Sequence, residues 1–429
     1  MKRITEKRLI LMVSVITMLL LPGVLVAAIP GITGPDFSLT AKTGTVVVDD
    51  GSNIFMWGFA NGTGSMQYPA PTLIVTEGQL VTVSLTNQLP VNVSIVFPGQ
   101  TGVTATGGVP GLLTNDAAPG GTVTYTFTAG QPGTYTYYSG TQPELQVEMG
   151  LVGALIIRPL QGPKYAYNDA ATVFDREYLF VLSEMDPPIH VKVQQGKFDE
   201  IDNSEAYPVA WFMNGRAGMD TVAANNDPIF PHQPYAALAL MQPGERVLVR
   251  MVGAGRDLHP FHLHGNHHRV IAKDGRLLKS GLTTDLSEGA FTTSVGPGQT
   301  FDAIWSWTGA NMGWDFYGHK GPNGEIGQAC VDAGVALQPG ESLADHCKPI
   351  PVAPPDNKDM FFGPLYTGSP YLGGAGPLPP GEGGFNPYGA YPFMWHSHAE
   401  KELTSYNVFP GGMLTWALVV PPGLLQPEP

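Results

Sequence analysis

Two stretches of sequence decide how this chain is interpreted: LHPFHLHGNHHRV at residues 258–270 and MWHSHAEKEL at residues 394–403. His262 and His264 are two residues apart, and so are His396 and His398. In a β-strand, residues two apart point to the same face. Two such strands lying side by side would gather four imidazoles, a donor set that suits copper or zinc. We therefore predict a metal site formed by these four histidines.

The same periodicity predicts a second set of residues on the opposite face. His259 is an odd number of residues from His262, and Ser397 lies between the two downstream histidines. A regular strand would turn both side chains away from the four imidazoles. The alternative for every histidine here is an ordinary hydrogen-bonded residue. Two His-x-His pairs in one chain favour a metal-related origin.

Composition favours an all-β protein, and the length allows two large domains or three small ones. The chain has 429 residues, of which 54 are Gly, 40 are Pro and only 14% are charged. This turn-rich profile is typical of β-sandwiches. The net charge of −14 argues against nucleic acid as a partner, because phosphate contacts need clustered Lys and Arg.

The amino terminus has the pattern of a targeting segment. Basic residues at positions 2, 3, 7 and 8 precede an apolar run that ends in Val-Ala-Ala. We predict a signal peptide over residues 1–28, with an uncleaved membrane anchor as the alternative. The protein is then exported, to the periplasm, the medium or the cell surface.

Short β-prone segments separated by Gly and Pro turns form two series. The first series lies within residues 35–160 and contains no histidine, whereas the second lies within residues 173–425. The stretch that begins at Met241 resembles the one that begins at Val75, which indicates an internal duplication. Within the second series, residues 308–391 form a long insert rich in Gly and Pro. An insert of this length is usually a functional loop or a spacer.

The insert carries both cysteines of the chain, Cys330 and Cys347. In an exported protein the default is a disulfide between them. The remaining histidines show no spacing pattern and are interpreted as ordinary loop residues: His190, His232, His319 and His346.

These motifs resemble the multicopper oxidases, particularly the two-domain members related to small laccases and copper nitrite reductases. The resemblance rests on His-Pro-Phe-His-Leu-His-Gly at residues 259–265, on Trp-His-Ser-His at residues 395–398, and on framework segments of the first half. It implies two cupredoxin-like Greek-key β-sandwich domains in tandem and copper as the cofactor. By the same analogy it implies a homotrimer.

The resemblance also implies a role for each residue. His262 matches a ligand of the type 2 copper, and the other three paired histidines match type 3 ligands. His259 and Met413 match the histidine and the axial position of the blue type 1 copper. In that family electrons pass from the blue copper along a His-Cys-His segment to a three-copper cluster.

The sequence departs from the family pattern at both kinds of site. Ser397 occupies the position of the blue-copper cysteine, and Glu402 stands where a second blue-copper histidine is expected. A serine hydroxyl does not replace a soft thiolate. The two histidine pairs expected in the first domain are replaced by Val96 with Pro98 and by Tyr138 with Gly140.

Three functions are compatible with this pattern. The first is a copper- or zinc-binding protein that uses the four paired histidines and has little or no oxidase activity. The second is a copper-dependent oxidoreductase with a nonstandard site, in which His259 and Glu402 take part as ligands or as an acid–base pair. The third is a metal-free structural or partner-binding module. No catalytic residue and no small-molecule substrate is assigned by the sequence.

Overall fold

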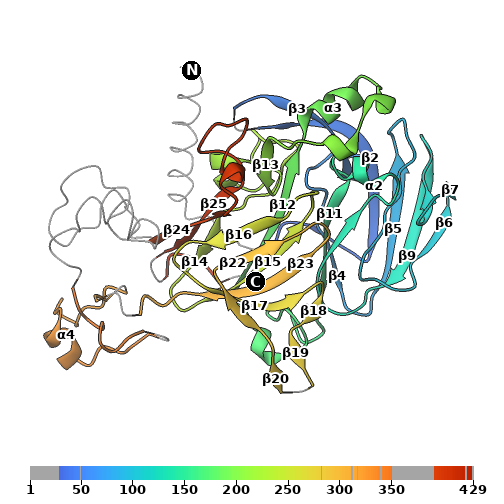
Figure 1. Ribbon diagram of the computed structural model, residues 1–429. Helices are drawn as coiled ribbons and strands as arrows, with labels where there is room; N and C mark the ends of the chain where they lie inside the picture. Colours follow the sequence, from blue (N-terminus) through green and yellow to red (C-terminus); the bar gives the residue numbers. More distant parts are fainter. Residues whose placement is uncertain are drawn as a thin grey trace.

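The computed structural model describes residues 29–427 except 49, 282, 311–312, 316, 339–340, 350–390 and 421–422. The predicted signal peptide and much of the 308–391 insert lie outside the described residues. Strands dominate, as the composition predicts, and they form two pairs of sheets (Figure 1). None of the described helices is long and apolar enough to cross a membrane.

The first pair of sheets uses strands from residues 32–158. One sheet has the order β1 (Ile32–Thr33), β4 (Leu73–Thr76), β11 (Val152–Arg158), β10 (Gly133–Tyr138). The other has the order β3 (Asn53–Asn61), β2 (Asp36–Val47), β5 (Leu80–Asn87), β9 (Thr122–Thr128), β6 (Thr104–Gly107). A small ribbon joins β7 (Val109–Pro110) to β8 (Asn115–Asp116).

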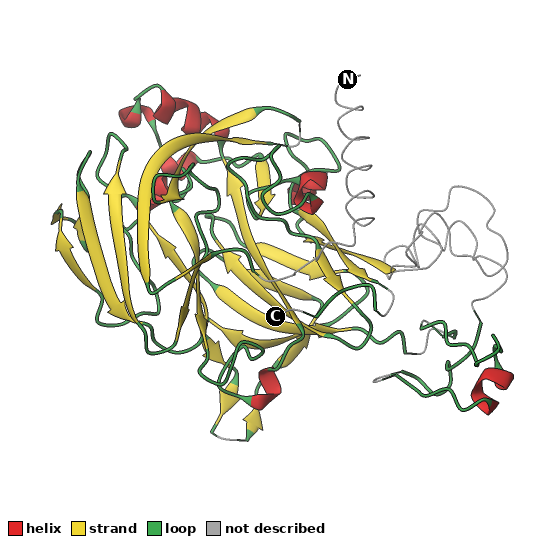
Figure 2. Cartoon of the chain, turned by 180° about the vertical axis from the view of Figure 1, so that it is seen from behind, coloured by secondary structure: helices red, strands yellow, loops and turns green. Residues whose placement is uncertain are grey.

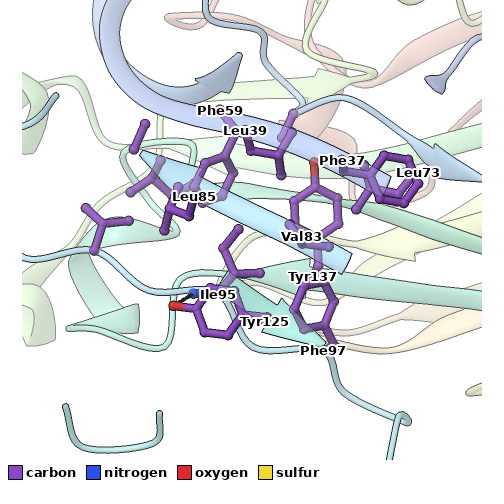
Figure 3. Packing of buried hydrophobic residues seen from close by; sticks show 14 of the residues in the cluster. Phe37, Leu39, Phe59, Leu73, Val83, Leu85, Ile95, Phe97, Tyr125 and Tyr137 are labelled. Carbon is purple, nitrogen blue, oxygen red and sulfur yellow. Dashed lines mark hydrogen bonds between the residues drawn. The ribbon is translucent and has the colours of Figure 1, made fainter. Parts of the chain in front are cut away.

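Alternating apolar residues on these strands build the first core. In β5, Val81, Val83 and Leu85 are buried, while the Thr and Ser residues between them are half-buried. This alternation follows from the two-residue repeat of a strand. The inward side chains of both sheets meet in one cluster, in which Phe97 and Tyr137 pack between the layers (Figure 3).

The second pair of sheets uses strands from residues 176–419. Its larger sheet contains β13 (Ala210–Met213), β12 (Arg176–Met185), β15 (Arg246–Gly253), β23 (Thr300–Ser306), β17 (His268–Lys273) and β18 (Arg276–Leu277), with β21 (Glu288–Ala290) paired to β17. Its partner sheet has the order β14 (Ala239–Met241), β25 (Leu414–Val419), β24 (Tyr391–Ser397), β16 (His259–Leu263), β22 (Thr292–Val295). A separate two-stranded ribbon, which follows β18 in the chain, joins β19 (Lys279–Ser280) to β20 (Thr284–Asp285).

Helical segments are short. They are α2 (Pro143–Gln146), α3 (Pro187–Gln194), α4 (Gln328–Asp332) and the 3-10 turns η1 (Ala170–Thr172), η2 (Phe198–Glu200), η3 (Asn203–Glu205), η4 (Gly218–Val222) and η5 (Glu400–Leu403). The predicted disulfide between Cys330 and Cys347 is present.

The internal duplication predicted from the sequence appears in the strand pairing. The parallel pair β2–β5 is followed by the antiparallel pair β5–β9, and β12–β15–β23 repeats this arrangement. Likewise, β4–β11–β10 is repeated by β14–β25–β24. Strand β10 of the first sandwich is therefore the counterpart of β24, which carries His396.

The two sandwiches pack against each other through a shared apolar cluster. Residues of the first, such as Met56 and Tyr68, meet residues of the second, such as Val181 and Phe212. The Tyr68 hydroxyl donates to Ser183 Oγ at 2.6 Å across this contact. Burial of this surface fixes the relative position of the two sheet pairs.

Candidate metal centre

Strand pairing places the two histidine stretches side by side, as the sequence predicts. Strand β16 pairs with β24 in antiparallel register, and His262 lies directly opposite His396. Each strand continues into a second histidine beyond its last paired residue. The backbone N–H of His264 donates to Met394 O, and that of His398 donates to Pro260 O. The sheet therefore fixes the backbone positions of all four histidines.

The four imidazole rings form one cluster. The ring of His262 has its centroid 4.8 Å from that of His398, 5.0 Å from His264 and 5.5 Å from His396. The rings of His264 and His396 are 4.7 Å apart. Ligand nitrogens of His262, His264 and His396 all lie within 4.8 Å of one another. This is the convergence of donors that a single metal ion requires.

Hydrogen bonds at the other ring nitrogens orient two of these side chains. Nδ1 of His262 lies 2.8 Å from Thr292 Oγ1, and Nδ1 of His396 lies 2.6 Å from the Ser397 carbonyl oxygen. Because a carbonyl only accepts, His396 carries its proton on Nδ1 and has a lone pair on Nε2. That Nε2 atom is buried and has no hydrogen-bond partner. An unpaired buried nitrogen is costly, and coordination to a metal would remove the cost.

The environment also keeps these rings neutral. Burial, reinforced by repulsion from the neighbouring imidazoles, lowers the pKa of His262, His264 and His396 to about 4. At pH 7 the three imidazoles are therefore neutral, with one ring nitrogen free of a proton, and this is the form that binds metals.

His398 lies at the rim of the cluster. Strand β24 ends at Ser397, so His398 begins the turn that leads into η5. Its side chain is 51% exposed, and its Nδ1 lies 3.5 Å from Glu400 Oε1. The structure thus brings three of the predicted ligands within reach of one ion and places the fourth beside them.

The opposite face of the same strands carries a different arrangement. His259 and Ser397 are fully buried there, as the strand periodicity predicts. Nδ1 of His259 lies 2.9 Å from Glu402 Oε2, and its Nε2 lies 2.9 Å from Glu184 Oε2. Met413 is buried in the core, and its backbone N–H donates to the Glu402 carbonyl.

The two carboxylates keep His259 protonated. Burial alone would lower its pKa, but the hydrogen bonds to Glu184 and Glu402 outweigh burial and raise the pKa to about 9. Both ring nitrogens then donate, and neither offers a lone pair to a metal. Sequence reasoning identified Glu402 but missed Glu184, which lies on β12, 75 residues before His259.

The first sandwich has a counterpart of the histidine pair, with other residues in it. Val96 and Tyr138 form an isolated antiparallel bridge at the equivalent place. The N–H of Val96 donates to the Tyr138 carbonyl at 2.9 Å. The scaffold is therefore duplicated, whereas histidines stand at these positions only in the second copy.

Two further histidines follow β16 and differ in burial. His267 is exposed and its ring packs on Phe291. His268 is buried, and its Nε2 lies 2.7 Å from Thr293 Oγ1. Thr292 and Thr293 thus contact His262 and His268 from adjacent positions on β22.

Family comparisons agree with this geometry. Models of the multicopper oxidases match residues 41–162 and residues 185–303, which together make up more than half of the chain. The chain belongs to the multicopper oxidase family. Membership implies copper as the metal and confirms the cupredoxin-like fold predicted from the sequence.

Curated relatives match over part of their length. A copper resistance protein A homolog of Pseudomonas syringae pv. tomato is 25% identical over 64% of this chain and 48% of its own length. Laccase-24 of Oryza sativa is 29% identical over 56% of this chain and 38% of its own length. The chain therefore spans less than half of either relative.

Solved structures support the fold. A blue copper oxidase from Nitrosomonas europaea superposes with a TM-score of 0.56 at 20% identity, covering 89% of this chain and 85% of its own. The multicopper oxidase mgLAC gives a TM-score of 0.54 at 20% identity, covering 92% and 86%.

Proposed function

We propose that this protein binds one copper ion through His262, His264 and His396, with His398 as a fourth ligand. The observation that carries the proposal is the buried Nε2 of His396, which has no partner and lies in the group of three converging imidazoles. Neutral imidazoles suit both copper and zinc. Family membership favours copper.

We further propose that the blue copper is missing. Both cysteines of the chain form the disulfide, so no thiolate remains for such a site. Ser397 stands at the position of the cysteine, and His259 is held between two carboxylates. A complete three-copper cluster is equally unsupported, because the first 189 residues contain no histidine. The protein would then handle copper with weak or no oxidase activity.

The copper content of the unaltered protein and of its variants tests this proposal. The purified full chain is loaded with Cu(II), dialysed and analysed for metal per chain. We expect the variant His262→Ala/His396→Ala to hold one copper fewer than the unaltered protein. The exposed neighbour His267 provides a matched control, and His267→Ala should keep the full content. Equal copper in all three proteins would contradict the proposal.

Turnover measurements test the oxidoreductase alternative: oxygen uptake is followed with phenols, and nitrite consumption is followed without oxygen. Phenols, or nitrite under anaerobic conditions, are offered to the copper-loaded protein. Turnover that disappears in His396→Ala would favour an active oxidoreductase over a copper-binding protein. The expected result is no turnover above that of free copper.

We also propose that the protein is exported and that it forms an oligomer. A disulfide is typical of oxidising compartments, and residues 1–28 have the predicted pattern of a signal peptide. By family analogy we propose a homotrimer. Cell fractionation and native mass measurement test the two points separately, and a monomer would remove the second.

A further inference from the structure

A small disulfide-bonded lobe follows β23, which is the last strand of the larger sheet along the chain. It comprises residues 313–349 as far as they are described, contains α4, and lies to one side of the sandwiches in both ribbon views (Figures 1 and 2). Among its described residues from Asp315 onward, none belongs to the hydrophobic clusters of the molecule. Segments that lack a core of their own are usually stabilised by disulfides or by metals.

Four metal-ligating side chains converge in this lobe. Their ligand atoms all lie within 4.8 Å of one another: Asp315, His319, Glu341 and His346. Two come from the segment before α4 and two from the segment after it. The sequence analysis assigned His319 and His346 to ordinary loops, whereas the structure places their ring centroids 4.8 Å apart.

One contact in this group sets an imidazole nitrogen against a carboxylate oxygen. Nδ1 of His346 lies 2.8 Å from Glu341 Oε1, while its Nε2 donates to the Val335 carbonyl at 2.9 Å. In the neutral ring, Nδ1 then has a lone pair that faces a carboxylate oxygen. Two acceptors at this distance repel each other unless a proton or a metal ion lies between them.

The second histidine also faces carboxylate oxygens. Nδ1 of His319 lies 2.8 Å from Asp315 Oδ2 and 3.4 Å from Glu341 Oε1. Glu341 Oε1 therefore faces both imidazoles. The backbone N–H of Cys347 donates to Asp315 Oδ2 at 2.9 Å, which links this carboxylate to the disulfide.

Charge balance points to a cation as well. The side chains of Asp315 and Glu341 are 1% and 4% exposed, and Asp345, next to His346, is also buried. Oδ2 of Asp345 is buried and has no hydrogen-bond partner. Asp315 and Glu341 thus place two buried carboxylates against two imidazoles, whereas Asp345 has Lys348 Nζ at 3.9 Å from its Oδ1. Buried charges require compensation.

We propose that Asp315, His319, Glu341 and His346 bind a divalent metal ion, with zinc as the best match, and that this ion stabilises the lobe. Two imidazole nitrogens and two carboxylate oxygens form a four-coordinate set without an open position, as in structural zinc sites. Around tetrahedral zinc the ligand atoms would be about 3.3 Å apart. Binding would widen the two nitrogen–oxygen contacts of 2.8 Å to this distance and draw in the ligand atoms that are now up to 4.8 Å apart. The site is separate from the candidate copper centre.

The experiment uses the full chain carrying His262→Ala and His396→Ala, so that the proposed copper centre does not contribute. After treatment with chelator, zinc uptake is measured by calorimetry and by metal analysis. We expect one zinc per chain. Loss of an outer-shell partner typically weakens binding 10–100-fold, so adding His319→Ala and His346→Ala should weaken zinc binding by more than about 100-fold.

Two further variants distinguish a loss of ligands from misfolding of the lobe. Asp332→Asn changes an exposed carboxylate of the same lobe and should keep the zinc. Glu341→Gln keeps the size of the ligand and should weaken zinc binding at least about tenfold. A thiol assay that finds no free cysteine shows that the disulfide has formed in each variant.

Protection from proteolysis provides an independent measurement. Zinc should slow cleavage within the lobe of the parent protein and have no effect on the His319→Ala/His346→Ala variant. The proposal is overturned if the parent binds no zinc, or if the lobe variants take up as much zinc as the parent. Either result leaves the copper proposal untouched, since that site is absent from every protein compared.

Discussion

The two faces of the β16–β24 ladder carry histidines in opposite chemical states. On the outer face, His262 and His396 have a pKa lowered to about 4, and Nε2 of His396 is buried without a partner. On the inner face, His259 has a pKa raised to about 9 and donates to two carboxylates. His259 and His262 are only three residues apart on one strand.

This difference shows that the neighbours, and not the histidines, decide the chemistry. Imidazoles surrounded by imidazoles become neutral, the form in which a ring nitrogen can bind a metal. An imidazole between two glutamates keeps a second proton, which occupies the positions a metal would need. We therefore propose copper on the outer face, while a proton occupies the inner face.

The largest expected effect is on the inner face. Substitution His259→Ala leaves Glu184 and Glu402 buried without their shared cation. Removing one partner of a buried ion pair typically costs about 3–5 kcal/mol of folding free energy. Chemical denaturation measures this loss. Substitution His262→Ala, on the outer face, should cost less than half as much, and equal losses would remove the distinction between the faces.

The second largest effect is expected in the pH dependence of the free energy of unfolding, which reports on His259 of the inner face. The pKa of His259 is raised from 6.5 to about 9, so its contribution is complete below pH 6.5 and is lost as the pH rises through about 9. A shift of this size corresponds to about 3 kcal/mol. Denaturation between pH 6 and 9.5 should show a decline in the unaltered protein that is absent from His259→Ala. A decline of the same size in both proteins would assign it to other groups.

Copper should stabilise only through the outer face. At a free concentration 100 times the dissociation constant, a ligand that binds only the folded state adds about 2.7 kcal/mol. Thermal unfolding with and without Cu(II) should show a rise in Tm for the unaltered protein and for His267→Ala. The variant His262→Ala/His396→Ala should show none. An unchanged Tm in all three would favour the metal-free alternative.

The smallest effect is expected from restoring a thiol alone. Ser397 is buried and accepts a hydrogen bond from the Ala399 N–H at 3.2 Å. Substitution Ser397→Cys should change stability by about 1 kcal/mol. It should produce no intense blue absorption with Cu(II), because His259 stays bound to its two glutamates. A strong blue band would show that the inner face is still a copper site.

Much of the candidate metal centre could be predicted from local sequence. The two-residue spacing in each His-x-His pair fixes the face of the strand, and it predicts that His259 and Ser397 point the other way. The sequence offered the pairing of β16 with β24 only as the condition for gathering the four imidazoles, and the strand register confirms it. The position of His398 was harder to predict, because β24 ends at Ser397 and the next residue begins a turn.

The remaining interactions depend on tertiary structure. Glu184 reaches His259 because β12 belongs to the facing sheet, and nothing in the sequence around Glu184 indicates this. Two of the four proposed ligands of the lobe precede α4 and two follow it. The spacing of the four residues does not follow one strand or helix repeat. Turns and a disulfide bring them together, and sequence patterns describe such contacts poorly.

The central claim is that copper binds on the outer face alone, and one comparison tests it most directly. Copper per chain and the visible spectrum are measured together for the unaltered protein and for His262→Ala/His396→Ala. The account predicts a difference of one copper per chain and no intense blue absorption in either sample. A difference of three or more coppers, or a strong blue band in the unaltered protein, would contradict it.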